Sequence, residues 1–353
     1  MKAWILHDIN DFKYGEVPKP DFDDSKVIVK VKAAGICGSD IPRAFETGAH
    51  VKPLIIGHEF SGQVVETSKE DSHWLGKRVG IFPLIPCEKC VPCRKKLYEM
   101  CRNYSYLGSR CDGGFAEYVA VPKWNLIELP ENVSFEQAAM LEPMAVAVHA
   151  MRKGFSLMNK SEIENANVAV CGLGTIGLLL VMFLRQAGVK NILAIGNKES
   201  QKIHLQALGI SSGNYCDCRQ DDVKEFLMDK TNASGVDLFF ECVGKNETIS
   251  QGVETVTPGG SMVLVGNPYS DMAFDKNTYW KILRNQIRIT GTWNSSFTGD
   301  GNDDWHYVLS SLEKGQIEPE KLITHQFKLE DLMDGFLIMR DKLEDYIKVM
   351  VTI

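Results

Sequence analysis

The stretch that decides the fold is residues 167–186, NVAVCGLGTIGLLLVMFLRQ. It begins with a short apolar run, passes through the turn GLGTIG (172–177) and ends in an apolar segment of helical length. The turn fits G-x-G-x-x-G, in which the second glycine lets the backbone approach a pyrophosphate and the third lets helix and strand pack closely. The stretch therefore predicts a strand, a dinucleotide-binding turn and a helix. A glycine-rich turn without a ligand is the alternative.

Further strand-like runs follow this stretch, with helical segments between them. They are Asn191–Ile195, Val236–Cys242, Ser261–Val265 and Ile287–Thr292. Alternation of this kind predicts a parallel, doubly wound sheet. The residues before this stretch show a different pattern.

Short β-like runs separated by glycine and proline fill the first 140 residues or so. They are Val27–Ala33, Gly62–Val65, Lys77–Phe82 and Phe115–Val121. After Trp293 the pattern is mixed, with a helix near Asp304–Glu313 and a final strand-like KVMVTI. We therefore expect a sheet domain at 145–291, inserted into a β-rich domain made of 1–144 and 292–353.

Composition narrows the function classes. The chain has 353 residues, 44% apolar, and a net charge of −7, so it does not attract nucleic acid or anionic membranes. Its most apolar stretch, 172–184, is too short to span a membrane, and the N-terminus does not look like a signal peptide. Four of ten cysteines crowd into 87–101, which suits a metal site in a reducing compartment. We expect a cytoplasmic protein.

The cofactor preference should be set near Gly196, Asn197 and Lys198. The dinucleotide fingerprint expects an Asp or Glu about 20 residues after the turn, where it binds the ribose hydroxyls. No carboxylate stands at these three positions, and Lys198 offers a cation to a 2′-phosphate. This favours NADP over NAD. The alternative is a solvated Lys198, with Glu199 reaching the ribose.

Four cysteines, Cys87, Cys90, Cys93 and Cys101, have the spacing C-x2-C-x2-C-x7-C. Four thiolates at such spacing can enclose one tetrahedral zinc ion. A ferredoxin-type iron–sulfur run has three residues before its last cysteine and a proline after it, and this chain has neither. We predict a structural zinc site, with disulfides or free thiols as alternatives.

A second, dispersed set could form a catalytic zinc site. Cys37 lies in GICGSD, His58 and Glu59 lie in GHEFSG, and Glu142 lies in LEP. Cys, His and carboxylate ligands that leave one position open are typical of catalytic zinc. Spacing alone does not establish the site, because an adjacent His and Glu are more often an ordinary surface or core pair.

Taken together, these segments resemble the zinc-dependent medium-chain alcohol and polyol dehydrogenases. The resemblance rests on GICGSD (35–40), GHEFSG (57–62), the four cysteines, DGGFAEY (112–118), LEP (141–143), GLGTIG (172–177) and ECVG (241–244). It implies a GroES-like β domain built from both chain ends, with an inserted Rossmann domain.

The resemblance also assigns roles around the catalytic zinc. It implies that Cys37 and His58 are ligands, that Glu142 stands at the third-ligand position, and that Glu59 binds zinc directly or through water. Ser39 matches the hydroxyl that passes on the alcohol proton. A histidine that often follows in the relay is replaced by Pro42, so the relay beyond Ser39 is unassigned.

The resemblance further implies cofactor contacts along the inserted domain. The residues concerned are Gly172, Gly174, Thr175, Ile176, Gly177, Gly196, Asn197, Lys198, Val243, Val265 and Thr292.

Within the family, the sequence is similar to the galactitol 1-phosphate 5-dehydrogenases. The shared segments include 37–45, 47–50, 83–87 and 108–118. Sorbitol dehydrogenases usually carry an aromatic residue at the position of Arg43 and an arginine near Asn294, and this sequence reverses both. Arg43 and Arg110 are therefore candidates for a substrate phosphate, although each could instead form a salt bridge or lie in solvent.

The function expected is reversible oxidation of a secondary alcohol of a polyol phosphate to a ketose phosphate. Zinc would act as a Lewis acid and NAD(P) would take the hydride. A dehydrogenase of an uncharged polyol, a diol or threonine is the first alternative, and a zinc-stabilised binding protein is the second. The family also implies a homodimer or homotetramer.

Overall fold

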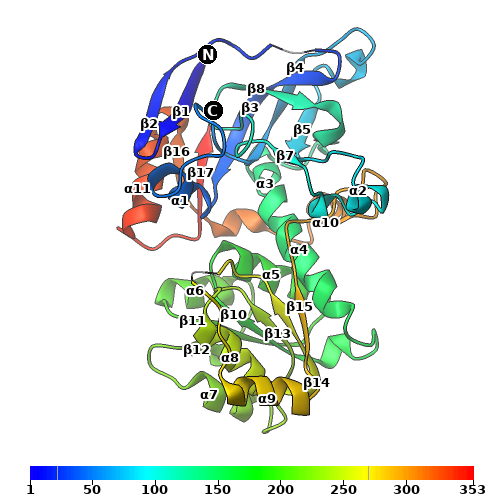
Figure 1. Ribbon diagram of the computed structural model, residues 1–353, viewed down its shortest axis with the longest axis vertical. Coiled ribbons are helices and arrows are strands. Elements are labelled where there is room, and N and C mark those ends of the chain that lie inside the picture. Colours follow the sequence, from blue (N-terminus) through cyan, green and yellow to red (C-terminus); the bar gives the residue numbers. More distant parts are fainter. Residues whose placement is uncertain (22, 269) are drawn as a thin grey trace. The chain divides into compact units, whose positions relative to one another are not determined.

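The computed structural model describes residues 1–21, 23–268 and 270–353. The chain forms two compact units (Figure 1). The first unit joins Met1–Pro143 to Ser295–Ile353, and the second is Met144–Asn294. The two ends of the chain therefore belong to one unit, and the middle of the chain forms the other.

The second unit is a six-stranded sheet in which strands alternate with helices along the chain. Its elements are β10 (Asn167–Cys171), α5 (Thr175–Gln186), β11 (Asn191–Gly196), α6 (Glu199–Ala207), β12 (Tyr215–Asp217), α7 (Val223–Lys230), β13 (Val236–Glu241), α8 (Asn246–Thr255), β14 (Val256–Leu264), α9 (Lys276–Arg284) and β15 (Arg288–Gly291).

All neighbouring strands of this sheet are parallel, in the order β12-β11-β10-β13-β14-β15. In chain order this is 3-2-1-4-5-6, the arrangement of doubly wound dinucleotide-binding sheets, and the predicted fold class is confirmed. The strands are apolar because helices cover both faces of such a sheet; Val168 to Cys171 are all buried.

The first unit is mainly antiparallel. Its strands are β1 (Lys2–Asp8), β2 (Asp11–Glu16), β3 (Lys26–Ile36), β4 (Glu59–Glu66), β5 (Arg78–Ile81), β6 (Leu84–Ile85), β7 (Ser105–Tyr106), β8 (Tyr118–Pro122), β9 (Leu126–Glu128), β16 (Ile323–Lys328) and β17 (Lys348–Thr352). Its helices are α1 (Asp40–Phe45), α2 (Val91–Arg94), α3 (Phe135–Ala139), α10 (Asp304–Glu313) and α11 (Leu332–Asp341). Helix α4 (Leu141–Phe155) begins in this unit and continues into the second.

Strand β3 organises the first unit. It pairs with β4, β8 and the C-terminal strand β17, so strands from both parts of the first unit lie in one sheet. Buried and exposed side chains do not alternate regularly along β3, because most of its side chains are buried. Val27, Val29 and Val31 belong to the main apolar cluster. This strand also leads directly to Cys37, and β4 begins at Glu59.

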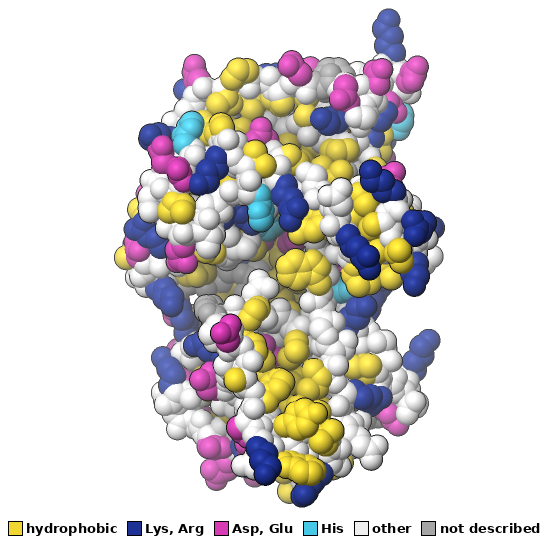
Figure 2. All heavy atoms as spheres, in the orientation of Figure 1, with side chains coloured by type: hydrophobic (Ala, Val, Ile, Leu, Met, Phe, Trp, Pro, Cys, Tyr) yellow, Lys and Arg dark blue, Asp and Glu magenta, His cyan; other side chains and the backbone are white. Residues whose placement is uncertain are grey.

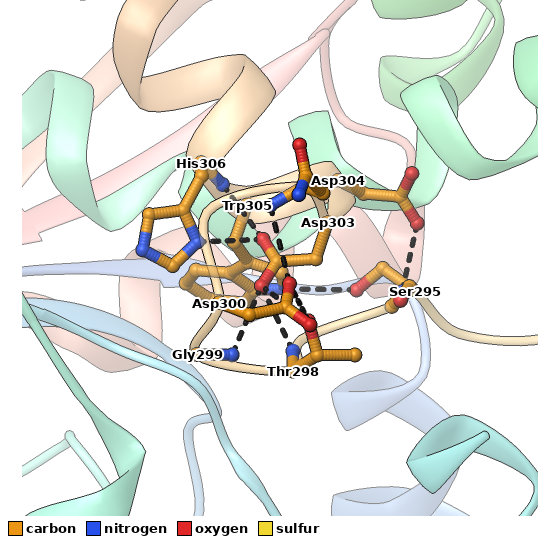
Figure 3. Close-up of polar contacts among 10 residues, drawn as sticks. Ser295, Thr298, Gly299, Asp300, Asp303, Asp304, Trp305 and His306 are labelled. Carbon is orange, nitrogen blue, oxygen red and sulfur yellow. Dashed lines mark hydrogen bonds and ion pairs between the residues drawn. The ribbon is translucent and has the colours of Figure 1, made fainter. Parts of the chain in front are cut away.

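The segment that returns the chain to the first unit is fastened by a compact polar network (Figure 3). Asp303 caps helix α10: its carboxylate accepts hydrogen bonds from the backbone N–H groups of His306 at 2.9 Å and of Thr298 at 2.8 Å. Trp305 donates from Nε1 to Ser295 at 3.0 Å. Because Asp303 is almost fully buried, these bonds replace the water that its charge would otherwise need.

Sequence patterns missed several elements of the first unit. The hairpin β1–β2, strand β16 and helix α11 were not predicted, and in the second unit β14 begins at Val256 rather than Ser261. Strand β16 is half-exposed and mixed in character, so its β structure depends on parallel pairing with β17. No helix in the part of the chain that the structure describes combines the length and apolarity needed to cross a membrane.

Candidate active site

Three of the predicted catalytic ligands meet in the first unit. Cys37 follows β3, His58 precedes β4, and Glu59 is the first residue of β4. The antiparallel register places Gly35 opposite Glu59, which brings the ends of the two strands together. One ligand atom from each of the three side chains lies within 4.8 Å of the others. Small movements would place all three on one ion at zinc–ligand distances of about 2.0–2.3 Å.

Asp40 contacts two residues of this group, His58 and Cys37. It is fully buried at the start of α1, and its Oδ1 lies 3.4 Å from His58 Nδ1. Its Oδ2 accepts a hydrogen bond from the Cys37 backbone N–H at 3.0 Å. A carboxylate behind a ligating histidine fixes the orientation of the ring, so Asp40 is a further candidate functional residue, which the sequence analysis did not single out. The only signal for it was its place in GICGSD.

Glu142 lies nearby but outside the three-residue group. It is the second residue of helix α4, is 8% exposed, and its Oε1 accepts a hydrogen bond from the Tyr106 hydroxyl at 3.2 Å. Burial and the charge of Glu59 together raise the pKa of Glu142 to about 7, although His58 and Lys348 oppose the shift. The nearby positive charges are therefore too few to stabilise the ionised carboxylate of Glu142 fully.

The donor set therefore fits a divalent cation. Cys37 and Glu59 lie together with His58, the charge of Glu59 acts on Glu142, and Lys348 is the lysine that acts on both glutamates. A bound divalent ion would offset the remaining negative charge and stabilise the ionised forms of Cys37, Glu59 and Glu142.

Ser39 stands beside the ligands. Its hydroxyl lies 3.3 Å from Cys37 Sγ, to which it donates, and the residue is half-buried at the start of α1. Pro42 lies within the same helix and has no side-chain donor or acceptor. The structure shows Ser39 in reach of the proposed metal centre and shows no side-chain relay through Pro42.

Besides Ser39, three residues are predicted to bind substrate, and they have different settings. Arg43 is 16% exposed, and its Nη1 donates to Asp40 at 2.6 Å. Arg110 is exposed and stacks its guanidinium 4.3 Å from the centre of the Tyr104 ring. Asn294 is the last residue of the second unit, with a φ of 55°. None of these settings identifies a substrate contact.

The four cysteines of the predicted structural zinc site are brought together by the loop around α2. Their Sγ atoms lie 3.4 Å apart for Cys90 and Cys93, 3.9 Å for Cys90 and Cys101, and 4.0 Å for Cys87 and Cys93. Disulfide sulfurs are about 2.05 Å apart, so these are thiols at the separation that a tetrahedral ion requires. Backbone N–H groups of Arg102 and Cys93 lower the pKa of Cys90 to about 6, which favours the thiolate.

The glycine turn of the second unit connects β10 to α5. Gly172 has a φ of 96°, and a side chain on Gly177 would overlap the Gly172 carbonyl, so both positions require glycine. Gly174 precedes the first turn of α5, and the space where its Cβ would point is open. Helix α5 begins at Thr175, directly after Gly174, without a side-chain cap, and the N-terminus of a helix favours an anion such as a pyrophosphate.

The end of β11 has an arrangement that the sequence did not reveal. The Tyr215 hydroxyl donates to the Lys198 carbonyl at 2.9 Å and accepts from the Lys198 N–H at 3.1 Å. Gln201 accepts from the Asn197 N–H at 2.8 Å. A Cβ on Gly196 would overlap Gln201 and lie 2.9 Å from the Tyr215 ring, so these two side chains fill the space that a ribose-binding carboxylate would need.

The remaining predicted cofactor residues line the ends of β13, β14 and β15. Val243 donates its N–H to the Glu241 carboxylate at 2.8 Å, and Val265 donates to the Glu241 carbonyl at 2.8 Å. Thr292 donates its N–H to Leu264 at 3.1 Å, while its buried hydroxyl has no hydrogen-bond partner among the described residues. Glu241 thus shapes this edge of the sheet, where doubly wound folds bind their ligands.

Comparisons with known proteins agree with this description. The family model for the alcohol dehydrogenase GroES-like domain matches residues 23–131, and the model for zinc-binding dehydrogenases matches residues 175–314. The predicted resemblance to galactitol 1-phosphate 5-dehydrogenases is confirmed. The enzyme of that name from Escherichia coli K12 is 33% identical over 86% of this chain and 86% of its own.

Relatives with other substrates are nearly as similar. The sorbitol dehydrogenase of Bacillus subtilis 168 is 27% identical over 99% of this chain and 97% of its own. The L-threonine 3-dehydrogenase of Bacillus velezensis is 31% identical over 92% of this chain and 91% of its own.

Solved structures show the same fold. The crystal structure of galactitol-1-phosphate dehydrogenase from Escherichia coli has a TM-score of 0.90 with 30% identity and full coverage of both chains. A zinc-binding dehydrogenase from Sinorhizobium meliloti 1021 bound to NADP has a TM-score of 0.89 with 26% identity, over 100% of this chain and 99% of that one. The chain therefore belongs to the zinc-binding medium-chain alcohol dehydrogenase family, and it is an NAD(P)-dependent oxidoreductase.

Proposed function

We propose that this enzyme interconverts a polyol phosphate and a ketose phosphate, with NADP as the preferred cofactor. The proposal of a polyol substrate rests on the group of Cys37, His58 and Glu59, with Glu142 beside it. The phosphate part is supported by the similarity to galactitol 1-phosphate 5-dehydrogenase and by Arg43 next to the ligand loop.

In this reaction, the residues of the chain would have the following roles. Cys37 and His58, with one of the two glutamates, would hold a zinc ion, which when bound supplies Lewis acidity to an alcohol oxygen. Ser39 would accept the hydroxyl proton because its oxygen lies beside the ligand loop. The turn at Gly174 and the N-terminus of α5 would hold the pyrophosphate of the cofactor that accepts the hydride. A second zinc would be held by the four-cysteine site.

A dehydrogenase of uncharged polyols or threonine remains a second candidate. The observation in its favour is the hydrogen bond from Arg43 to Asp40, because an arginine that neutralises a buried carboxylate need not serve the substrate. The relatives that are sorbitol and threonine dehydrogenases agree with this candidate.

Two variants of Arg43 separate these candidates. Lysine can keep the ion pair with Asp40 but loses the planar fork that binds phosphate through two parallel bonds. Arg43→Lys should raise KM for phosphorylated polyols by about tenfold or more and leave rates with uncharged polyols nearly unchanged. Steady-state kinetics with matched polyols, with and without phosphate, measures both values.

Arg43→Ala should harm both substrate classes, since it leaves the buried Asp40 without its partner. Arg110→Ala is the companion test for the second candidate cation. If Arg43→Lys lowers the rates with phosphorylated and plain polyols equally, Arg43 only supports the ligand loop and the uncharged-polyol candidate becomes the better one.

The preference for NADP is supported by the filled space at Gly196 and by the cation at Lys198. Tyr215 and Gln201 leave no room for a ribose-binding carboxylate, and the similar structure from Sinorhizobium meliloti was solved with NADP. A charge-assisted contact of Lys198 with the 2′-phosphate would contribute about 1.5–3 kcal/mol.

Lys198→Ala should therefore lower the ratio of kcat/KM for NADP to that for NAD by about tenfold to a hundredfold. Lys202→Ala, one turn further along α6, is the matched control and should change the ratio little. Gly196→Asp is a poor test, because the new side chain would displace Gln201 and Tyr215 rather than simply add an acceptor. An unmodified enzyme that uses NAD as well as NADP would reject the proposed preference.

We also propose a homodimer or homotetramer. Helix α9 presents Tyr279, Trp280 and Leu283 to solvent, and Phe274 just before it is also exposed. Figure 2 shows hydrophobic side chains gathered on this face of the second unit. Apolar patches of this kind commonly mark interaction surfaces.

A further inference from the structure

Arg110 lies at the end of a row of aromatic rings that starts at the candidate metal centre. The Tyr106 ring meets the His58 ring edge-on, with centroids 5.8 Å apart, and the Tyr106 hydroxyl donates to Glu142 at 3.2 Å. Tyr104 packs edge-on against Tyr106, with centroids 6.1 Å apart. The guanidinium carbon of Arg110 lies 4.3 Å from the centre of the Tyr104 ring. Two tyrosine rings therefore separate the guanidinium from His58.

The turn that carries Arg110 is fastened to the segment that carries His58. The Arg110 N–H donates to the Tyr106 carbonyl at 2.8 Å, which closes the turn. Gly108, inside the turn, has a φ of 76°. A side chain on Gly108 would overlap the Gly57 carbonyl and lie 2.8 Å from the backbone nitrogen of His58. Because the two segments touch without a side chain between them, the backbone of Arg110 has a fixed position relative to His58.

The charge of Arg110 is available to a ligand. The side chain is exposed, and its Nη1 donates to the Tyr104 carbonyl at 3.4 Å. It forms no ion pair with a carboxylate among the residues that the structure describes. Arg43, by contrast, is 16% exposed and paired with the buried Asp40. A guanidinium stacked on a ring by its face keeps the N–H donors at its edge, and these donors match a phosphate through two parallel bonds.

The two tyrosines offer a surface for a carbon chain. Tyr104 and Tyr106 are both half-buried, so part of each side chain is open. Ligand sites are lined mostly by apolar and aromatic groups, with a few polar groups that fix the orientation of the ligand. Here the polar groups stand at the two ends of the row, the metal ligands at one and the Arg110 guanidinium at the other. A chain that joins an alcohol at the metal to a phosphate at Arg110 must pass both rings.

We infer that Tyr106, Tyr104 and Arg110 form a substrate subsite that binds phosphate at Arg110 and thereby selects for chain length. A phosphate bound there lies two aromatic rings from the metal, so the reacting carbinol must be several carbons away from the carbon that carries the phosphate. Hexitol phosphates meet this condition. Glycerol 3-phosphate does not, because its secondary carbinol adjoins the phosphate-bearing carbon. The inference rests on the polyol phosphate activity proposed above.

The test compares three kinds of substrate for the full-length, zinc-loaded enzyme: hexitol phosphates with galactitol 1-phosphate among them, the same hexitols without phosphate, and glycerol 3-phosphate. In the unmodified enzyme, kcat/KM for the best hexitol phosphate should be at least about tenfold above that for glycerol 3-phosphate. Arg110→Ala should raise KM for the hexitol phosphate about tenfold or more and leave kcat nearly unchanged, because the metal ligands and Ser39 are untouched. Rates with the plain hexitol should not change.

Equilibrium binding gives a readout that does not depend on turnover. Calorimetric titration of the enzyme saturated with reduced cofactor, on which an alcohol cannot be oxidised, should show the same loss of affinity for the hexitol phosphate in Arg110→Ala. Arg102→Ala, at another exposed arginine of the same segment, is the matched control and should bind as the unmodified enzyme does. Tyr104→Leu should also weaken binding, because it removes the stacked ring, whereas Tyr104→Phe keeps the ring and should not.

The results that would overturn the inference differ from those that would overturn the proposed function. If the unmodified enzyme prefers hexitol phosphates and Arg110→Ala keeps that preference, or loses activity with both classes equally, Arg110 does not bind the phosphate. If glycerol 3-phosphate is used as efficiently as the hexitol phosphates, the selection for chain length is rejected. If the unmodified enzyme has no preference for phosphorylated polyols, the proposed function fails and the inference fails with it.

Discussion

His58→Ala is expected to abolish turnover while the enzyme still binds its dinucleotide. The substitution removes one ligand of the candidate metal centre, and the Lewis acidity lost there is worth several kcal/mol in the transition state, about a thousandfold or more in kcat. The predicted pyrophosphate contacts all lie in the second unit, at the turn between β10 and α5, so they are unchanged.

Three measurements check this result together: kcat, metal content and dinucleotide affinity by calorimetry. Cys37→Ser should behave in the same way. His50→Ala, at an exposed histidine of the same unit, is the matched control and should keep full activity. An active His58→Ala enzyme without zinc at that site would reject the proposed mechanism.

Cys90→Ser is expected to cost one zinc per chain and to disorder the loop at 87–101. This loop has little else to hold it: α2 is four residues long, and Val91, Leu97 and Met100 are exposed. Structural zinc contributes on the order of 10 kcal/mol to the folding of small zinc-dependent modules, so a large share of the local stability should be lost.

Metal analysis and hydrogen exchange of the loop provide the readouts. Exchange should accelerate at 87–101, while the parallel sheet of the second unit keeps its protection. Cys218→Ser, at an exposed free thiol, is the control and should lose no metal. Iron with acid-labile sulfide in the unmodified protein would contradict the zinc assignment.

The fold could be predicted largely because its deciding signals are local. The run at 167–171 became β10 without change, and alternation of apolar runs with helical segments gave the correct class for the second unit. Strands held by pairing rather than by their own pattern were harder. Strand β16 is an example, since its neighbour β17 lies about twenty residues further along the chain.

The residues of the site could be predicted only where they stand in recognisable motifs. Cys37, His58 and Glu59 stand in recognisable segments, and the structure brings them together. Lys348 was missed because it lies 289 residues from Glu59, with no motif of its own, and only the pairing of β17 with β3 brings it near. Tyr215 was missed for the same reason, since only the pairing of β12 with β11 brings it to Gly196 and Lys198.

The most direct test of the central claim is one set of kcat/KM values for the zinc-loaded enzyme. Polyol phosphates and the same polyols without phosphate would each be assayed with NADP and with NAD, galactitol 1-phosphate and galactitol among them. The account predicts the highest value for a phosphorylated polyol with NADP, at least about tenfold above both its unphosphorylated counterpart and the same substrate with NAD. Equal or higher values for sorbitol or threonine with NAD would contradict it.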